Sequence, residues 1–225
     1  MIDWTANLHP LNLAAIIYRP ADDVDSLLAR FADDLIGRGH RLGGIVQRNT
    51  KGDRGQRERM EVIDLMTGRT VRICQDLGNG AAACRLNSGA LAEASTAVTR
   101  AVAADVELVI VNKFSKQEAA GGGLRAEIAD AVTAGRPVLT AVPDKCYDAW
   151  TKFTGSFGTT LVCERRIVED WWREMWLREK RARISAHFRP AHEREATVVG
   201  GMLPFGSRPL ERSLADHHVG RLDHC

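Results

Sequence analysis

The sequence predicts an α/β protein whose mainly parallel sheet is covered by helices on both faces, giving three layers. Apolar runs of strand length occur at residues 11–18, 106–111 and 137–142, and segments with helical periodicity lie between them. These runs lack the alternation of a half-solvated sheet, which favours strands buried on both faces. A chain of 225 residues with 44% hydrophobic content can bury one substantial core. We therefore expect one α/β domain over residues 1–165, then a long helix and an extended tail over residues 166–225.

The first strand and helix lie near the N-terminus. Residues 11–18 (LNLAAIIY) form the apolar run that we assign to the central strand. Asp22 and Asp23 follow as candidate N-caps, and apolar side chains then recur at helical spacing from Val24 to Leu35. This pattern predicts a strand, a short loop and an amphipathic helix.

A small antiparallel insertion is predicted after this unit. Residues 43–47 are expected to form a strand, and the polar stretch at residues 48–57 an exposed loop or hairpin tip. Two short strand-like runs, residues 60–64 and 71–75, are separated by a turn whose length suits a hairpin better than a crossover.

The remaining part alternates helices and strands, with helices at residues 89–104, 124–134, 147–153 and 166–187 and strands at 106–111, 137–142 and 159–163. The last helix carries Trp171, Trp172 and Trp176 on one face. This face is expected to be core or a homo-oligomer contact, and a base-stacking platform is an alternative.

Composition excludes some classes of function. Lys and Arg number 31 against 29 Asp and Glu, so no broad basic face for nucleic acid is expected. The N-terminus lacks a basic start with a long apolar run, which favours a cytoplasmic location and no membrane contact. Five cysteines without paired spacing indicate reduced thiols. The tail contains four possible metal ligands, and the alternative is an unstructured end: His217, His218, His224 and Cys225.

Ligands of such sheets bind beyond the carboxyl ends of the strands, so functional residues are expected in the loops there. The first, residues 19–23, stands between a buried strand and a helix N-terminus that could accept an anion. It has no glycine and no Lys-Ser/Thr pair, which a phosphate loop needs. Asp22 and Asp23 are instead expected to cap the helix, or to repel phosphate.

The segment after the strand at residues 106–111 offers the best functional candidates: Asn112, Lys113, Lys116 and Glu118. Gly121, Gly122 and Gly123 then precede a helix that begins near Arg125, and their backbone N–H groups could bind an anion. The alternatives are a solvated loop for the first group and a flexible helix start for the second.

Two further loops add candidate ligand-binding residues. Gln47 and Arg48 follow one strand, and Gln75 and Asp76 follow another. Cys84 lies next to an arginine that could lower the pKa of its thiol, although a structural thiol is the alternative.

Residues 11 to about 165 resemble a bacterial family catalogued as domain of unknown function 2478, and more distantly the P-loop nucleoside triphosphatases that include thermophilic cancer-related NTPase homologues. Four segments carry the resemblance: LNLAAIIYRPADDVDSLLARFADDLIGRGHRLGGIVQRN, QDLGNGAAACRL, VIVNKFSKQEAAGGGLRAEI and AGRPVLTAVP. It implies a P-loop NTPase-like fold, and it implies a link to molybdate uptake or nitrogen fixation.

One departure from the NTPase pattern bears on activity. In the related enzymes the strand ends in Asp-Glu-Ile-Gly-Lys-x-Glu, where the acids serve magnesium and water activation. Asn112 and Lys113 replace the two acids here, while Lys116 and Glu118 match. A neutral amide and a cation cannot hold magnesium as carboxylates do, so nucleoside-triphosphate hydrolysis is in doubt. The Asn-Lys-x-Asp motif for guanine is incomplete, because Ser115 replaces its aspartate.

The sequence therefore favours an accessory protein that binds a nucleotide or an oxyanion such as molybdate at a degenerate P-loop-type site, without a bound metal. Its ligand residues are expected to be Gln47, Arg48, Gln75, Asp76, Asn112, Lys113, Lys116, Glu118, Gly121, Gly122, Gly123 and Arg125. One alternative is a divergent NTPase with Glu118 as catalytic residue. Another is a non-catalytic interaction module that uses the tryptophan helix and the tail.

Overall fold

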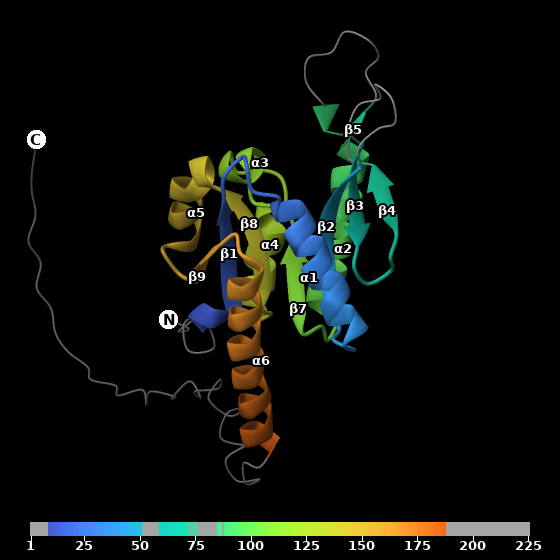
Figure 1. Ribbon diagram of the computed structural model, residues 1–225. Helices are drawn as coiled ribbons and strands as arrows, with labels where there is room; N and C mark the ends of the chain where they lie inside the picture. Colours follow the sequence, from blue (N-terminus) through green and yellow to red (C-terminus); the bar gives the residue numbers. More distant parts are fainter. Residues whose placement is uncertain (1–8, 51–58, 73, 76–84, 87, 188–225) are drawn as a thin grey trace, which may run out of the picture. The chain divides into compact units, whose positions relative to one another are not determined.

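The computed structural model describes residues 9–50, 59–72, 74–75, 85–86 and 88–187. Its main sheet confirms the predicted α/β fold, with parallel strands at its centre and helices on both faces (Figure 1). Across the sheet the strands are β4 (Thr70–Arg72), β3 (Arg59–Asp64), β2 (Leu42–Thr50), β7 (Leu108–Val111), β8 (Val138–Pro143), β1 (Leu13–Tyr18) and β9 (Thr159–Val162). The sheet is parallel from β2 to β9.

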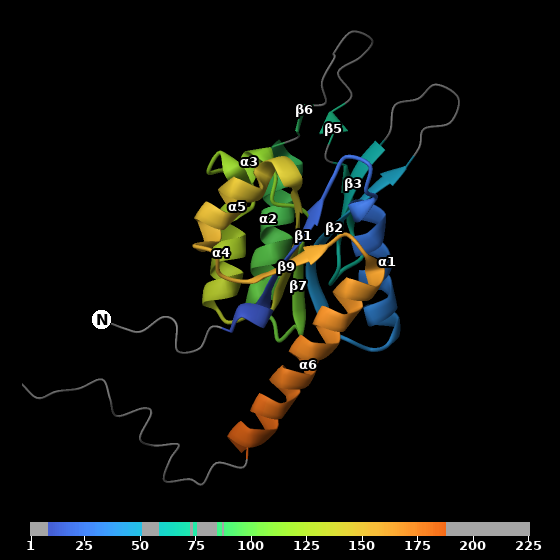
Figure 2. The same ribbon diagram turned by 60° about the vertical axis from the view of Figure 1, so that its left-hand side comes forward.

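The helices cover the two faces of the sheet, as Figure 2 shows in side view. One face carries α1 (Val24–Gly37) and α6 (Arg165–His187), and the other carries α2 (Ser88–Ala103), α4 (Arg125–Thr133) and α5 (Tyr147–Thr154). Short helical segments complete the set: η1 (Pro10–Asn12), α3 (Lys116–Ala119) and η2 (Asp144–Cys146).

Strand β1 lies between β8 and β9 and is buried because of its small and branched side chains. Ala14 and Ile16 pack toward α1 and α6, whereas Leu13 and Ala15 pack toward the other layer. Both sets alternate along the strand, as the period of two requires. Burying each large aliphatic side chain of this kind contributes roughly 1.5–3 kcal/mol.

The antiparallel insertion is present, but it is part of the main sheet. Strand β2 runs through Thr50, and Arg48 and Asn49 pair with Glu61 and Met60 of β3. The predicted loop at residues 48–57 was therefore wrong for its first three residues, because β3 extends the pairing of β2. Residues 51–57 lie outside the described part of the chain.

The expected strand at residues 71–75 is divided between two elements. Its first half belongs to β4, and its second half is β5 (Cys74–Gln75), which pairs with β6 (Arg85–Leu86) in a separate two-stranded ribbon. Cys84 and Asp76 lie outside the described residues. Among the described residues, no helix is long and apolar enough to cross a membrane.

The tryptophan face of α6 packs into the core. Trp171 and Trp172 are buried together with Met175, and the indole of Trp171 donates to the carbonyl of Leu11 at 3.0 Å. The interaction-module hypothesis therefore loses its tryptophan surface, and an oligomer remains a prediction.

The chain divides into two compact units, residues 1–180 and 181–225. Residues 181–187 complete α6, and the tail with its histidines lies outside the described residues. The division predicted between residues 165 and 166 stays a prediction.

Candidate functional site

The candidate site lies where β2 and β7 end, next to the first turn of α1. These two strands pair in parallel, with Ile45 opposite Val111, so their carboxyl ends meet at one edge. Gly44 permits this close approach: its φ is +91°, and a Cβ there would lie 2.1 Å from the carbonyl oxygen of Ile110. The edge is where open α/β sheets bind ligands.

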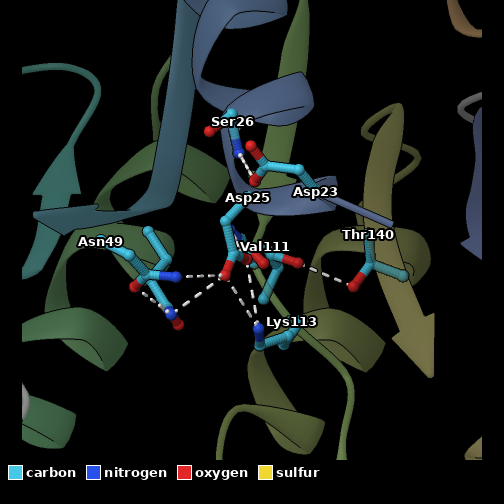
Figure 3. A network of polar contacts seen from close by, with 9 residues as sticks. Asp23, Asp25, Ser26, Asn49, Val111, Lys113 and Thr140 are labelled. Carbon is cyan, nitrogen blue, oxygen red and sulfur yellow. Dashed lines mark hydrogen bonds and ion pairs between the residues drawn. The ribbon is translucent and has the colours of Figure 1, made fainter. Parts of the chain in front are cut away.

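Asp25, in the first turn of α1, is the centre of the site and is buried. Its Oδ2 accepts hydrogen bonds from Gln47 Nε2 at 3.1 Å and Asn49 Nδ2 at 3.0 Å. Its Oδ1 accepts one from Asn112 Nδ2 at 3.0 Å. Lys113 Nζ lies 3.1 and 3.2 Å from the two oxygens. Figure 3 shows the carboxylate between Asn49 and Lys113, with donors from β2 and from the end of β7.

The ammonium of Lys113 is held between the carboxylate and an aromatic ring. Besides Asp25, it lies 5.6 Å from the ring centroid of Tyr18, the last residue of β1. Burial, and then the negative charge of Asp25, raise the pKa of the Tyr18 phenol to about 12. The phenol therefore stays neutral at physiological pH, and Lys113 supplies the one positive charge that contacts Asp25 among the described contacts.

The loop at residues 19–23 uses its own carboxylates where a phosphate loop would bind an anion. Asp22 Oδ2 accepts the backbone N–H of Arg19 at 2.7 Å, and Asp23 Oδ1 accepts that of Ser26 at 3.2 Å. The hydrogen bonds from Ser26 lower the pKa of Asp23. Asp23 is therefore the N-cap of α1, as predicted, whereas Asp22 binds within the preceding loop and does not cap the helix. A P-loop places its lysine and hydroxyl at the start of the following helix, where α1 has Val24 and Asp25.

Glu118 is buried and supports the loop between β7 and α4. Its Oε2 accepts the N–H of Ser115 at 2.8 Å, and its Oε1 accepts the N–H of Leu124 at 3.0 Å. Gly123, with a φ of +59°, fits against this carboxylate, since a Cβ would lie 2.0 Å from Oε1. The Glu118 carboxylate thus binds the backbone N–H groups of residues on either side of the three glycines. A catalytic or ligand role for Glu118 remains a prediction.

The other predicted ligand residues are scattered. Arg48 pairs with the exposed Asp33 at 2.7 Å, Lys116 is exposed, and Arg125 donates to the carbonyl of Glu118 and covers the Phe153 ring at 4.3 Å. Gly121 and Gly122 donate backbone hydrogen bonds within the loop. Of Gln75 only the strand pairing is described. The structure thus brings together Gln47, Asn112 and Lys113 from the predicted set.

Sequence reasoning missed Asp25, Asn49 and Tyr18. Asn49 follows Gln47 by two residues, so the two share one face of a strand, but this signal was lost when the strand was ended at Gln47. Asp25 was hidden among the capping aspartates. The structural role of Glu118 could have been predicted. Glu118 follows Ser115 by three residues, which is the spacing of a capping box.

A pocket of about 510 Å³ adjoins the loop before α1. Its lining residues are Ala21, Asp22, Asp23, Leu27, Arg30, Cys163 and Arg165. Burial, and then the charges of Asp22 and Asp23, raise the pKa of the Cys163 thiol to about 11, so this cysteine is a poor nucleophile. No group of three or more His, Cys, Asp or Glu side chains that could hold a metal ion occurs among the residues that the structure describes.

Comparisons with known proteins agree with the sequence resemblance. A curated relative, the molybdenum import ATP-binding protein ModC 2 of Bradyrhizobium diazoefficiens, is 53% identical over 218 residues. The match covers 97% of this chain and 24% of the relative, so the chain spans about a quarter of that protein's length. No solved structure matches the chain. The family model described as "Protein of unknown function (DUF2478)" matches residues 13–171, more than half of the chain, and the protein therefore belongs to this family.

Proposed function

We propose that this chain is an accessory protein of molybdenum import, with a P-loop NTPase-like fold whose site binds an anion without hydrolysing a nucleotide. One observation carries the proposal. At the edge where such a fold would bind phosphates and magnesium, the carboxylate of Asp25 and the ammonium of Lys113 neutralise each other at 3.1 Å. The charges on which phosphoryl transfer depends are therefore already paired within the chain.

Hydrolysis of a nucleotide would need groups that the described residues of the site do not supply. Magnesium prefers oxygen ligands in octahedral geometry, usually carboxylates and phosphates. Asn112 presents its Nδ2 to Asp25, and Lys113 adds a positive charge where the cation would stand. Glu118, the candidate for water activation, has both oxygens in hydrogen bonds to backbone N–H groups. These contacts support a non-hydrolytic role.

The link to molybdenum rests on the relative from Bradyrhizobium diazoefficiens, whose name describes an ATP-binding protein of molybdenum import. Because the similarity is confined to 24% of that protein, the remaining three quarters can contain its ATP-binding part. The quarter shared with this chain would then serve an accessory role, such as sensing the transported anion. We also propose a cytoplasmic location for this chain, which agrees with the name of its ATP-binding relative.

Phosphate release from ATP and GTP with magnesium tests the catalytic half of the proposal. We expect none above a protein-free blank. Magnesium-dependent release that is lost in Glu118→Gln, but kept in the exposed control Glu174→Gln on α6, would establish an active divergent NTPase instead.

Deletion in the relative tests the accessory half. Removing the quarter that matches this chain should leave ATP binding by the rest of that protein intact, while molybdate-dependent uptake changes. Loss of ATP binding after the deletion would show that the shared quarter contains the nucleotide site, and would contradict the proposed role.

A further inference from the structure

Four side-chain nitrogen atoms converge on the carboxylate of Asp25, and they have the composition of an anion site. Three are neutral amide donors, from Gln47, Asn49 and Asn112, and the fourth is the ammonium of Lys113. We propose that this four-nitrogen cluster binds a single tetrahedral oxyanion, and that the Asp25 carboxylate occupies the cluster when no ligand is present. This inference rests on the proposed function and names the ligand class of the same site.

The backbones of three donors, Gln47, Asn49 and Asn112, are positioned by β2 and β7 independently of Asp25. Gln47 and Asn49 lie on β2, opposite Val62 and Met60 of β3, and Asn112 directly follows β7. Gln47 and Asn112 are each only 4% exposed, and Gln47 also donates to Asn49 Oδ1 at 2.8 Å. Donors fixed in this way would remain in position if the carboxylate moved aside, which is the preorganisation that anion binding requires.

Asp25 differs from the other carboxylates at this edge in how it is held. Asp22, Asp23 and Glu118 each accept a backbone N–H and form part of a local turn or cap. In the described part of the chain, the hydrogen bonds to the Asp25 carboxylate all come from side chains. Rotation of the Asp25 side chain would therefore break no backbone hydrogen bond of this set, and an incoming anion could take over the same donors.

Charge and access limit the ligand to a small anion. One ammonium and three amides suit a compact oxyanion with four oxygens, since each oxygen can accept one hydrogen bond. A polyphosphate carries several negative charges, and the carboxylates of Asp22 and Asp23 in the loop before α1 would oppose them. Asn49 is exposed and the side chain of Lys113 is 21% exposed, so the cluster can be reached from solvent on this side.

Titration calorimetry of the full chain with molybdate, tungstate, sulfate and phosphate tests the proposal. Wild type should bind at least one of these anions weakly. Asp25→Asn, which removes the competing charge at constant size, should bind at least about tenfold more tightly, a change of about 1.4 kcal/mol. Lys113→Met should lower the affinity for the anion by at least the same factor. Asp25→Ala provides a second variant in case the asparagine amide blocks the cluster.

Matched controls separate the cluster from general charge effects. Asp33→Asn removes another α1 carboxylate, which pairs with Arg48 on the surface. Lys152→Met on α5, which removes an exposed lysine, is the control outside every predicted ligand set. Asp33→Asn and Lys152→Met should bind as wild type does. The proposal is overturned if neither Asp25 variant binds any of the four anions, or if Asp33→Asn gives the same gain. A failure here leaves the non-hydrolytic role standing, whereas phosphate release from ATP would contradict that role even if oxyanions bind.

Discussion

The strands β2 and β7 carry a carboxylate cluster at each end, and the two clusters are built differently. At the carboxyl ends, Asp25 accepts hydrogen bonds from side-chain amides and an ammonium. At the amino ends, Glu107 accepts the backbone N–H of Arg41 at 2.9 Å and the indole N–H of Trp176 at 2.9 Å, and lies 3.4 Å from His40 Nδ1. The hydrogen bonds to Asp25 all come from side chains. Glu107 instead links the start of β2 to helix α6.

The Glu107 cluster has the features of a structural contact. His40 packs edge-on against Trp172 and Trp176, with ring centroids 5.1 and 5.5 Å apart, and Trp172 is part of the core. The indole that donates to Glu107 is packed against other side chains, so it could not move to a different partner without losing apolar burial. We infer that the Glu107 cluster, at the amino ends of β2 and β7, stabilises the fold. The four-nitrogen cluster, at their carboxyl ends, binds the ligand. The predictions below test this division.

The largest change in stability is expected from Trp172→Ala, which removes a large side chain of α6 that is buried in the core. The free energy of unfolding should fall by about 3–5 kcal/mol, the usual cost of such a cavity. Leu177→Ala, at an exposed position of the same helix, should change it by no more than about 0.5 kcal/mol. Urea denaturation measures both. Oxyanion affinity of the folded Trp172→Ala protein should equal that of wild type, and a change there would couple the two ends.

Replacing each central carboxylate by its amide compares the two clusters directly. Glu107→Gln should lower the free energy of unfolding by about 1–3 kcal/mol, because one of its donors then faces an N–H group. Asp25→Asn should cost a similar amount or less, since Asn49 is exposed and its amide can donate to water instead. Calorimetry with oxyanions should distinguish the variants: only Asp25→Asn should alter affinity. An equal change in Glu107→Gln would remove the functional distinction.

Sequence patterns predict the fold because its strongest signals are local. The run that forms β1 is apolar over its whole length, and the α1 periodicity begins directly at its caps. Predicted and observed boundaries of α2, α4 and α5 agree within about two residues, the ordinary scatter of helix ends. These elements can be read without knowing what they pack against.

The site is harder to predict because it depends on contacts between distant residues. Asp25 meets Asn112 and Lys113 across 87 and 88 positions of the chain, and it meets Asn49 only if β2 continues past Gln47. That continuation is caused by pairing with β3, which polar residues at this point do not signal. Asn112 and Lys113 were found because they follow a buried strand at the ligand-binding edge.

Acid should remove the stability that Glu107 contributes at the amino ends of β2 and β7. Burial alone would raise the pKa of Glu107, but the hydrogen bonds from Arg41 and Trp176 and the nearby His40 lower it overall. A lowered carboxyl pKa gives stability that is complete above the unfolded value, roughly 4.3, and is lost as pH falls through the folded value. Denaturation of wild type and Glu107→Gln should therefore differ at neutral pH and converge in acid. A constant difference across this range would contradict the assignment.

The smallest expected effect is on Tyr18, which reports on the carboxyl end. Its pKa is raised to about 12 by burial and then by the charge of Asp25. Because the folded state holds the proton more tightly, this group's contribution to stability is lost as pH rises from the ordinary tyrosine value, about 10, toward 12. Asp25→Asn should lower the Tyr18 pKa, measured from tyrosinate absorbance, whereas Asp33→Asn should not. An unchanged pKa in Asp25→Asn would mean that the carboxylate does not act on Tyr18 in solution, and that Asp25 rests away from the four-nitrogen cluster.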